Sequence, residues 1–481
     1  MSRVPPASVV EGSRGVHVLR AVQGRRRVRR PPQESDPRGV PRAAREGRSG
    51  RGRRRGGDLP LDHGLTVGAI RDLAGKFWSG EVDPRELWKP TGSSEELAPG
   101  LVFLHAFANV SVLRTGAGLV LIDTSNYQAR AKTFAAVRTI DPAPVHAAIY
   151  THGHADHACG MPPFLDEARS KSWARPRIVG HRAVAARFDR YKATADWNAQ
   201  INARQFSIPP TWPREYDYPD LVYDDTLRFS AGDVTLELVH GRGETDDHTW
   251  IWWPAHRVLF TGDLFIWVSP NAGNPQKVQR YAAEWAAALR AMAAREPEIL
   301  VPGHGVPIFG AARVRQALDD TAQWLEHLVN ETVARMNAGA TLDQILAEVR
   351  PPAHLADRPY LSAVYDDPEY VVRNIWRLYG GWWDGVPSHL QPAPHASIAR
   401  EVASLAGGVD ALVARARELA EEGDLRLAGH LIDWAAAASD NRAVHVARAE
   451  IYDRRAKQAN ALMTRGIFSA TSKDSSTRAS G

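Results

Sequence analysis

Cysteine is almost absent from this sequence of 481 residues. The single one, Cys159, cannot form an internal disulfide, and no CxxC pair exists to build a thiolate metal or redox site. Long apolar runs are also missing, because no stretch approaches the roughly 18 consecutive apolar residues that a membrane-spanning helix needs. Residues 1–30 contain no apolar segment followed by a cleavage site. We therefore expect a cytoplasmic protein with no membrane partner, in which any metal is held by His, Asp and Glu.

Positive charge is concentrated at the N-terminus. Residues 1–57 contain sixteen arginines against four acidic residues, a net charge of +12, whereas the whole chain carries +5. The remaining residues therefore carry −7. The segment is rich in Gly and Pro and has no apolar periodicity, which predicts a disordered basic tail. It could serve as a nucleic-acid-binding arm, but the acidic body lacks a basic groove interleaved with aromatic residues, so we expect no specific nucleic-acid partner.

The rest of the chain divides by its periodicity. Residues 58–330 alternate short β runs with helical stretches, including a helix expected over residues 278–294, which predicts an α/β layered domain. Residues 331–470 are rich in Ala, Leu, Arg and Glu at helical spacing, which predicts an all-α domain. The Ser- and Thr-rich residues 471–481 are expected to be disordered.

Metal-ligating residue types gather in the motif THGHADH, residues 151–157, directly after a predicted strand. Buried imidazoles and a carboxylate this close together would repel one another or stay unsatisfied unless a cation joined them. The alternate residues His152 and His154 point one way. Asp156 and His157, at the turn into the next helix, point to a second position. The spacing therefore predicts two metal ions.

Two catalytic metals need further ligands downstream, because each needs about three protein ligands and an open position. Three candidates follow predicted strands: Glu244 in GRGETDDH, Asp263 in TGD and His304 in PGHG. His240 and His248 are alternatives to Glu244 as the ligand from the first of these segments.

The order HxHxDH, GET, TGD and PGHG resembles the metallo-β-lactamase superfamily. The resemblance implies an αββα sandwich with a dinuclear metal site along its edge, holding two Zn²⁺, or Fe or Mn. It assigns His152, His154 and Glu244 to one metal, and Asp156, His157 and His304 to the other. Asp263 would bridge the ions and orient a metal-bound hydroxide. Glu244 stands where the superfamily usually has His, and this departure is similar to type III alkyl sulfatases.

Two other segments resemble that branch. NAGNPQKVQR, residues 271–280, is similar to the stretch that holds sulfate, which implies that Asn271, Asn274 and Arg280 bind substrate and that Arg280 also acts in catalysis. Asn274 is shifted by one residue. A guanidinium pairs well with the array of sulfate oxygens. Residues 373–392 resemble the opening of the alkyl sulfatase dimerisation domain, which implies that residues 331–470 form a helical domain of a homodimer.

The sequence therefore predicts a metal-dependent hydrolase that cleaves small-molecule alkyl sulfate esters to alcohol and inorganic sulfate. Trp197, Trp212 and Tyr216 are candidates for an apolar groove, with loop packing as the alternative. Asp123 is a candidate to support the metal ligands from behind. The rival interpretations are another hydrolase of the same fold, acting on thioesters, lactones or phosphodiesters, and a metal-bound nucleic-acid-interacting protein.

Overall fold

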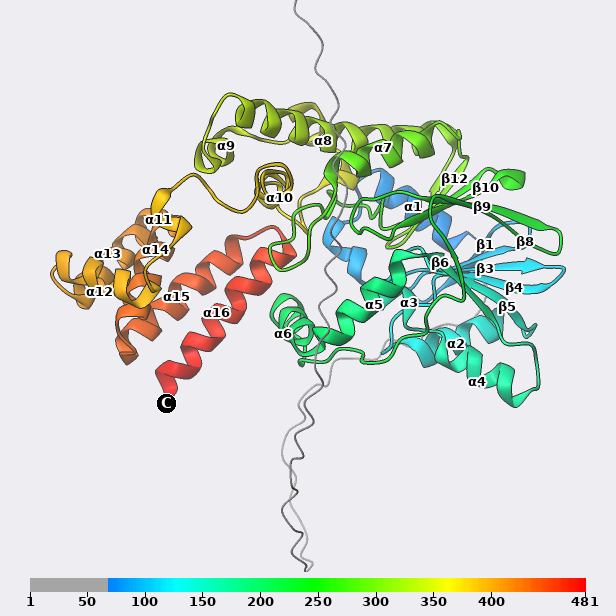
Figure 1. Ribbon diagram of the computed structural model, residues 1–481, viewed down its shortest axis with the longest axis horizontal. Coiled ribbons are helices and arrows are strands. Elements are labelled where there is room, and N and C mark those ends of the chain that lie inside the picture. The colour runs from blue at the N-terminus through cyan, green and yellow to red at the C-terminus, as the bar shows by residue number, and fades with distance from the viewer. Residues whose placement is uncertain (1–67) are drawn as a thin grey trace, which may run out of the picture. The chain divides into compact units, whose positions relative to one another are not determined.

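A computed structural model describes residues 68–481 (Figure 1), and the predicted basic tail, residues 1–57, lies outside the described residues. Two β-sheets form its N-terminal part. The first sheet has the strand order β1 (Ser94–Ala98), β2 (Leu101–Leu104), β3 (Val110–Thr115), β4 (Gly118–Ile122), β5 (Val145–Ile149), β6 (Arg177–His181) and β7 (Leu221–Tyr223). The second has the order β13 (Ile308–Phe309), β12 (Ile299–Pro302), β11 (Val258–Gly262), β10 (Thr249–Trp253), β9 (Val234–His240) and β8 (Thr226–Ala231).

The two sheets share one apolar core between them. Because side chains alternate along a strand, Phe103 and Leu113 of the first sheet face Leu236, Ile251 and Phe260 of the second in a single buried cluster. The outer face of the first sheet packs on α2 (Arg130–Ile140), α4 (Pro162–Ser170) and α5 (Ala183–Ala193). That of the second packs on α1 (Ala69–Trp78), α7 (Ala282–Ala293) and α8 (Ala311–Asn337). The predicted αββα sandwich is therefore confirmed.

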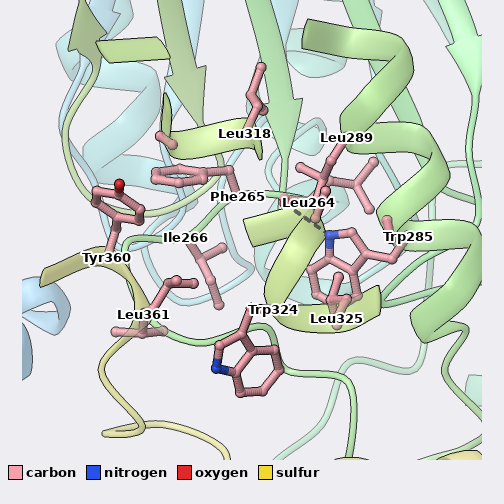
Figure 2. Close-up of a cluster of buried hydrophobic side chains, with 14 of the residues drawn as sticks. Leu264, Phe265, Ile266, Trp285, Leu289, Leu318, Trp324, Leu325, Tyr360 and Leu361 are labelled. Carbon is pink, nitrogen blue, oxygen red and sulfur yellow. Dashed lines mark hydrogen bonds between the residues drawn. The ribbon is translucent and has the colours of Figure 1, made fainter. Parts of the chain in front are cut away.

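A cluster of large side chains fixes the segment that follows β11 (Figure 2). Leu264, Phe265 and Ile266 from this segment pack with Trp285 of α7, and the indole Nε1 of Trp285 donates a hydrogen bond to the Leu264 carbonyl at 2.9 Å. Tyr360, from a 3₁₀ turn in the helical part, lies in the same cluster. The β-sandwich and the helical part therefore share an apolar core next to the segment that follows β11.

The remainder of the chain is helical, as predicted. Its helices are α9 (Leu342–Glu348), α10 (Pro368–Gly380), α11 (Pro387–Leu390), α12 (His395–Leu405), α13 (Val409–Glu422), α14 (Leu425–Ala438), α15 (Arg442–Gln458) and α16 (Leu462–Ser480). Gly423 ends α13 with φ of 93°, a left-handed conformation that glycine adopts without strain. The predicted boundary at residue 330 falls inside α8, which runs on to Asn337. Among residues 68–481, no helix is long and apolar enough to cross a membrane.

The C-terminal end differs from the expectation of disorder over residues 471–481, because α16 continues to Ser480. Its small polar side chains pack on α15. Ser472 donates a hydrogen bond to the Ala449 carbonyl at 2.9 Å, and the buried Ser475 accepts one from Arg448 at 3.0 Å. A Ser- and Thr-rich composition weakens a helix on its own, but here tertiary contacts stabilise it.

Candidate metal centre

The predicted ligands come together at one edge of the sandwich, in the segments that follow four strands. His152 and His154 lie in the loop after β5, and Asp156 and His157 lie in the short helix α3 (Ala155–Ala158). Glu244 lies between β9 and β10, Asp263 follows β11 directly, and His304 follows β12. Five of the seven side chains are buried, and those of His154 and Asp156 are partly buried.

The seven side chains form two groups. His152, His154, Glu244 and Asp263 make the first group, and Asp156, His157 and His304 make the second. Within each group, one ligand atom from every residue lies within 4.8 Å of the others. This division agrees with the assignment implied by the resemblance for the other six residues, and Asp263, implied to be the bridge, falls in the first group.

Asp263 lies between the two groups. Its Oδ2 is 3.7 Å from His152 Nε2 in the first group and 3.4 Å from His304 Nε2 in the second, and its Oδ1 is 3.3 Å from His157 Nε2. One carboxylate thus faces imidazoles of both groups, which is the arrangement that a bridging ligand requires.

Burial and neighbouring charges shift the pKa values of the clustered side chains in opposite directions. Burial lowers the pKa of His152 well below its usual value, and the neighbouring His157 lowers it further. Burial would also lower the pKa of His304, but the carboxylates of Asp263 and Asp156 raise it to about 10. Burial raises the pKa of Glu244 to about 7. Imidazoles and carboxylates this close together are the usual ligands of a divalent metal.

Within the described part of the chain, several buried atoms of the cluster have no hydrogen-bond partner, and these include His152 Nε2, Glu244 Oε2 and Asp263 Oδ1. An unpartnered buried polar atom costs free energy on the order of 1–3 kcal/mol. These atoms are nitrogen and carboxylate oxygen donors that converge on the interior of the cluster. The residues present therefore fit divalent metal ions.

The two histidines considered as alternatives to Glu244 have other roles. The Nε2 of His248 donates a hydrogen bond to the Thr261 carbonyl at 3.1 Å, and His248 belongs to neither group of metal ligands. His240 Nδ1 donates to the His248 carbonyl at 2.9 Å, and its ring stacks on His181 with centroids 3.8 Å apart. The structure thus brings Glu244 into the cluster and leaves both histidines in its surroundings.

Residues that surround the metal cluster orient the imidazoles of His157 and His304. Asp123, which follows β4, accepts a hydrogen bond from His157 Nδ1 at 2.8 Å and from the Thr151 hydroxyl at 2.7 Å. His304 Nδ1 donates to the Phe107 carbonyl. These contacts leave Nε2 of both rings directed at the cluster, the arrangement in which a carboxylate or carbonyl fixes a metal-binding histidine.

Two of the three predicted substrate residues adjoin the metal cluster. Asn271 Nδ2 and Arg280 Nη1 both contact Glu244 Oε1, leaving Glu244 Oε2 toward the cluster. Arg280 is buried rather than on an exposed helix face, since α7 begins only at Ala282. The structure does not bring Asn274 to this place, because its Oδ1 accepts a hydrogen bond from the Gln276 amide in a local turn.

A cavity of about 470 Å³ opens next to these residues. Asp156, Glu244, Asp263, Asn271 and Arg280 line its polar end. Its other walls are mostly apolar and include Trp88, Phe107, Tyr191, Phe206, Ile208, Trp212 and Ile266. Trp212 therefore reaches the cavity. Trp197 is 60% exposed and outside it, and Tyr216 stacks on Phe188 at 4.7 Å in the core instead.

Lys277 and Tyr365 also line the cavity, and the sequence analysis singled out neither. Lys277 is partly buried, its Nζ is 3.4 Å from Asn202 Oδ1, and among the described residues no carboxylate lies within ion-pair distance of it. Burial, and then the charge of Arg280, lower its pKa to about 8. Tyr365 comes from the helical part, and its ring packs against Trp88 at 4.6 Å. The only signal in the sequence was the position of Lys277 inside the segment 271–280.

Family models match both parts of the chain. Residues 106–304 match the metallo-beta-lactamase superfamily, and residues 341–477 match the alkyl sulfatase dimerisation family. The chain therefore has a metallo-β-lactamase-like region followed by a region similar to the alkyl sulfatase dimerisation domain. The resemblance found in the sequence is thereby confirmed.

Similar proteins have longer chains. A linear primary-alkylsulfatase from Pseudomonas is 28% identical over 66% of this chain and 64% of its own length. An (R)-specific secondary-alkylsulfatase from Pseudomonas is 27% identical over 79% of this chain and 63% of its own length. The solved structure of the inverting sec-alkylsulfatase Pisa1 from Pseudomonas matches with a TM-score of 0.70 and 24% identity, over 79% of this chain and 65% of that one. The chain thus spans slightly less than two thirds of the length of these relatives.

Proposed function

We propose that this protein is a metal-dependent hydrolase that releases inorganic sulfate from alkyl sulfate esters. One observation carries the proposal: the candidate metal cluster, a pair of cationic side chains and an apolar cavity meet at the same place. The likeness to alkylsulfatases of known activity supports it.

The ligands would be divided as the two groups divide. His152, His154 and Glu244 would hold one ion, and Asp156, His157 and His304 the other, with Asp263 shared between them. We propose two Zn²⁺, since imidazole and carboxylate suit zinc, although Fe and Mn take similar ligands. When bound, such ions act as Lewis acids and lower the pKa of water.

The chain's own residues would bind and orient the ester. Arg280 offers a guanidinium fork and Lys277 a second positive charge to the sulfate oxygens, and Asn271 adds a neutral donor. Among residues 68–481, the buried Nε of Arg280 has no hydrogen-bond partner, so it can donate to a ligand. Negative charge that develops on the sulfate as the ester bond breaks would be stabilised by these groups. The alkyl chain would lie against Trp212, Phe206 and the other apolar walls.

The test measures inorganic sulfate released from primary and secondary alkyl sulfates by zinc-loaded protein. The His152→Ala variant should lose bound metal and sulfate release together. The Arg280→Ala variant should keep its metal content and lose about ten-fold or more in kcat/KM, because it removes a charge-assisted contact. Two ions bound per chain with no sulfate release, but with hydrolysis of thioesters, lactones or phosphodiesters, would contradict the proposal.

We also propose that the protein acts as a homodimer, on the match of residues 341–477 to the dimerisation family. Large apolar side chains stand exposed in this part, with Trp382 68% and Leu405 88% accessible. Light scattering coupled to size exclusion should give twice the chain mass of 52.9 kDa. A mass of one chain at micromolar concentration would contradict a stable dimer.

A further inference from the structure

The segment between β11 and α7 carries both Asn271 and Arg280, and residues of the helical part form hydrogen bonds to its backbone. Ser269 at its start donates its backbone amide to the Ser362 carbonyl at 3.1 Å. The turn that follows, residues 271–274, contains no helix or strand and includes Asn274 at a positive φ of 27°. Such a turn depends on outside contacts to keep its conformation.

Asp366 supplies one set of contacts. It lies just before α10 and is only 1% exposed. Its Oδ2 accepts the backbone amide of Gly273 at 2.6 Å and that of Asn274 at 3.2 Å. Among residues 68–481, no cation lies within ion-pair distance of this carboxylate, so the turn amides are its main partners. Burial raises its pKa to about 6, and these amide donors oppose that rise.

Asn374, on α10, supplies the other set. Its Nδ2 donates to the Ala272 carbonyl at 2.7 Å and to the Arg280 carbonyl at 3.0 Å. One amide group thus ties the beginning of the segment to its end. The Nε2 of Gln279, in the same segment, donates a hydrogen bond to the Asn374 carbonyl at 3.1 Å.

The packing at Gly273 leaves the turn no freedom to move toward α10. A Cβ built on Gly273 would lie 2.4 Å from the Tyr370 carbonyl carbon and 2.5 Å from the Val371 nitrogen. The backbone of the turn therefore rests directly on the backbone of the first turn of α10. Asp366 and Asn374 flank this contact on both sides.

We propose that Asp366 and Asn374 are positioning residues for the anion-binding pair Asn271 and Arg280. Both belong to the region that matches the dimerisation family, so this region completes the active site of its own chain in addition to any contact it makes with a partner. The inference rests on the proposed function, since it assumes that Asn271 and Arg280 bind the sulfate group. Neither positioning residue lines the cavity, and their effect must pass through the backbone of residues 271–280.

The test uses the full-length, metal-loaded protein with the variants Asp366→Asn and Asn374→Asp. The first weakens the acceptor of two amides, and the second replaces a donor by an acceptor facing two carbonyls. Both should raise KM for an alkyl sulfate and the dissociation constant for inorganic sulfate about ten-fold, with a smaller change in kcat and unchanged metal content. Asp433→Asn is the control, because the Asp433 carboxylate accepts hydrogen bonds from Arg448 Nε at 2.8 Å and from the Tyr452 hydroxyl at 2.6 Å, between α14 and α15. It should leave both constants unchanged.

A double-mutant cycle separates positioning from general stability. Asp366→Asn should change the logarithm of the sulfate dissociation constant less than half as much in the Arg280→Ala variant as in the wild type. The reason is that the side chain positioned by Asp366 is missing from that variant. Fully multiplicative effects, or variants that lose thermal stability while KM and sulfate affinity stay at wild-type values, would overturn the inference.

Binding of inorganic sulfate, measured by calorimetry, keeps this inference separate from the proposed function. If the wild-type protein cleaves no alkyl sulfate, the proposed function fails. Weaker sulfate binding in both variants would still support positioning. A metal-loaded wild-type protein that binds no sulfate would overturn the inference as well.

Discussion

Replacing Lys277 by arginine should flatten the alkaline limb of the pH profile for kcat/KM. An alkyl sulfate stays anionic across the range, so its binding depends on the charge of the protein. The pKa of Lys277 is lowered to about 8, first by burial and then by Arg280, whereas Asp156 and Glu244 oppose the shift. Bound divalent ions would lower this pKa further, because they add positive charge nearby.

The direction of the change in kcat/KM with pH follows from the charge of Lys277. Lys277 is charged below its pKa and neutral above it, so substrate binding weakens as the pH rises through about 8 or just below it. At one pH unit above the pKa, about a tenth of the lysine remains charged, and kcat/KM should fall about ten-fold. An arginine keeps its charge throughout this range.

The assay measures initial rates of sulfate release at low substrate concentration from pH 6.5 to 9.5 for three proteins. The wild type should show the fall, Lys277→Arg should not, and Lys277→Ala should be low and flat. Metal content at each pH controls for loss of ions. The reasoning is refuted if Lys277→Arg falls in parallel with the wild type, or if Lys277→Ala matches wild-type kcat/KM at pH 7.

Three further predictions concern the supports of the site. Asp123→Asn should weaken metal affinity about 10- to 100-fold in a chelator competition, because it replaces the charged acceptor of His157 by a neutral amide; unchanged affinity would contradict this. Gly273→Ala should lower the melting temperature, since its Cβ meets the backbone of α10, whereas Gly75→Ala in the open interior of α1 should raise it slightly; equal effects would count against the packing. The Asp366 carboxyl has a folded pKa of about 6 against 3.8 in the unfolded chain, so the folded state binds more protons between these values. Stability from this group should therefore fall by about 2 kcal/mol as the pH rises from 4 to 6, and urea unfolding of Asp366→Asn should lack that slope.

Local motifs made the metal cluster predictable. The four residues of HxHxDH are neighbours in the chain, and the strand before them carries them to the sheet edge. Glu244, Asp263 and His304 each follow a strand of the second sheet, so the strand pattern alone brought them near the same edge. The order of these motifs was specific enough to indicate the fold as well.

The anion pocket was less predictable because its structure depends on distant contacts. A helix was expected from residue 278, but it begins at Ala282, and the residues before it form the loop that buries Arg280 and brings Lys277 to the cavity. Asp366 and Asn374 reach this loop from about 90 to 100 residues further along the chain, and Tyr365 from the same region lines the cavity. No periodicity or motif marks such contacts, which arise only when α10 packs on the sandwich.

The central claim is that one site combines metal binding with recognition of a sulfate ester. The most direct measurement is the stoichiometry of zinc and the rate of sulfate release from decyl sulfate, followed in the same samples as stripped protein is titrated with Zn²⁺. The account predicts that sulfate release rises with bound zinc and reaches its limit near two ions per chain, and that His152→Ala shows neither. Sulfate release by protein free of metal, or no release when two ions are bound, would contradict it.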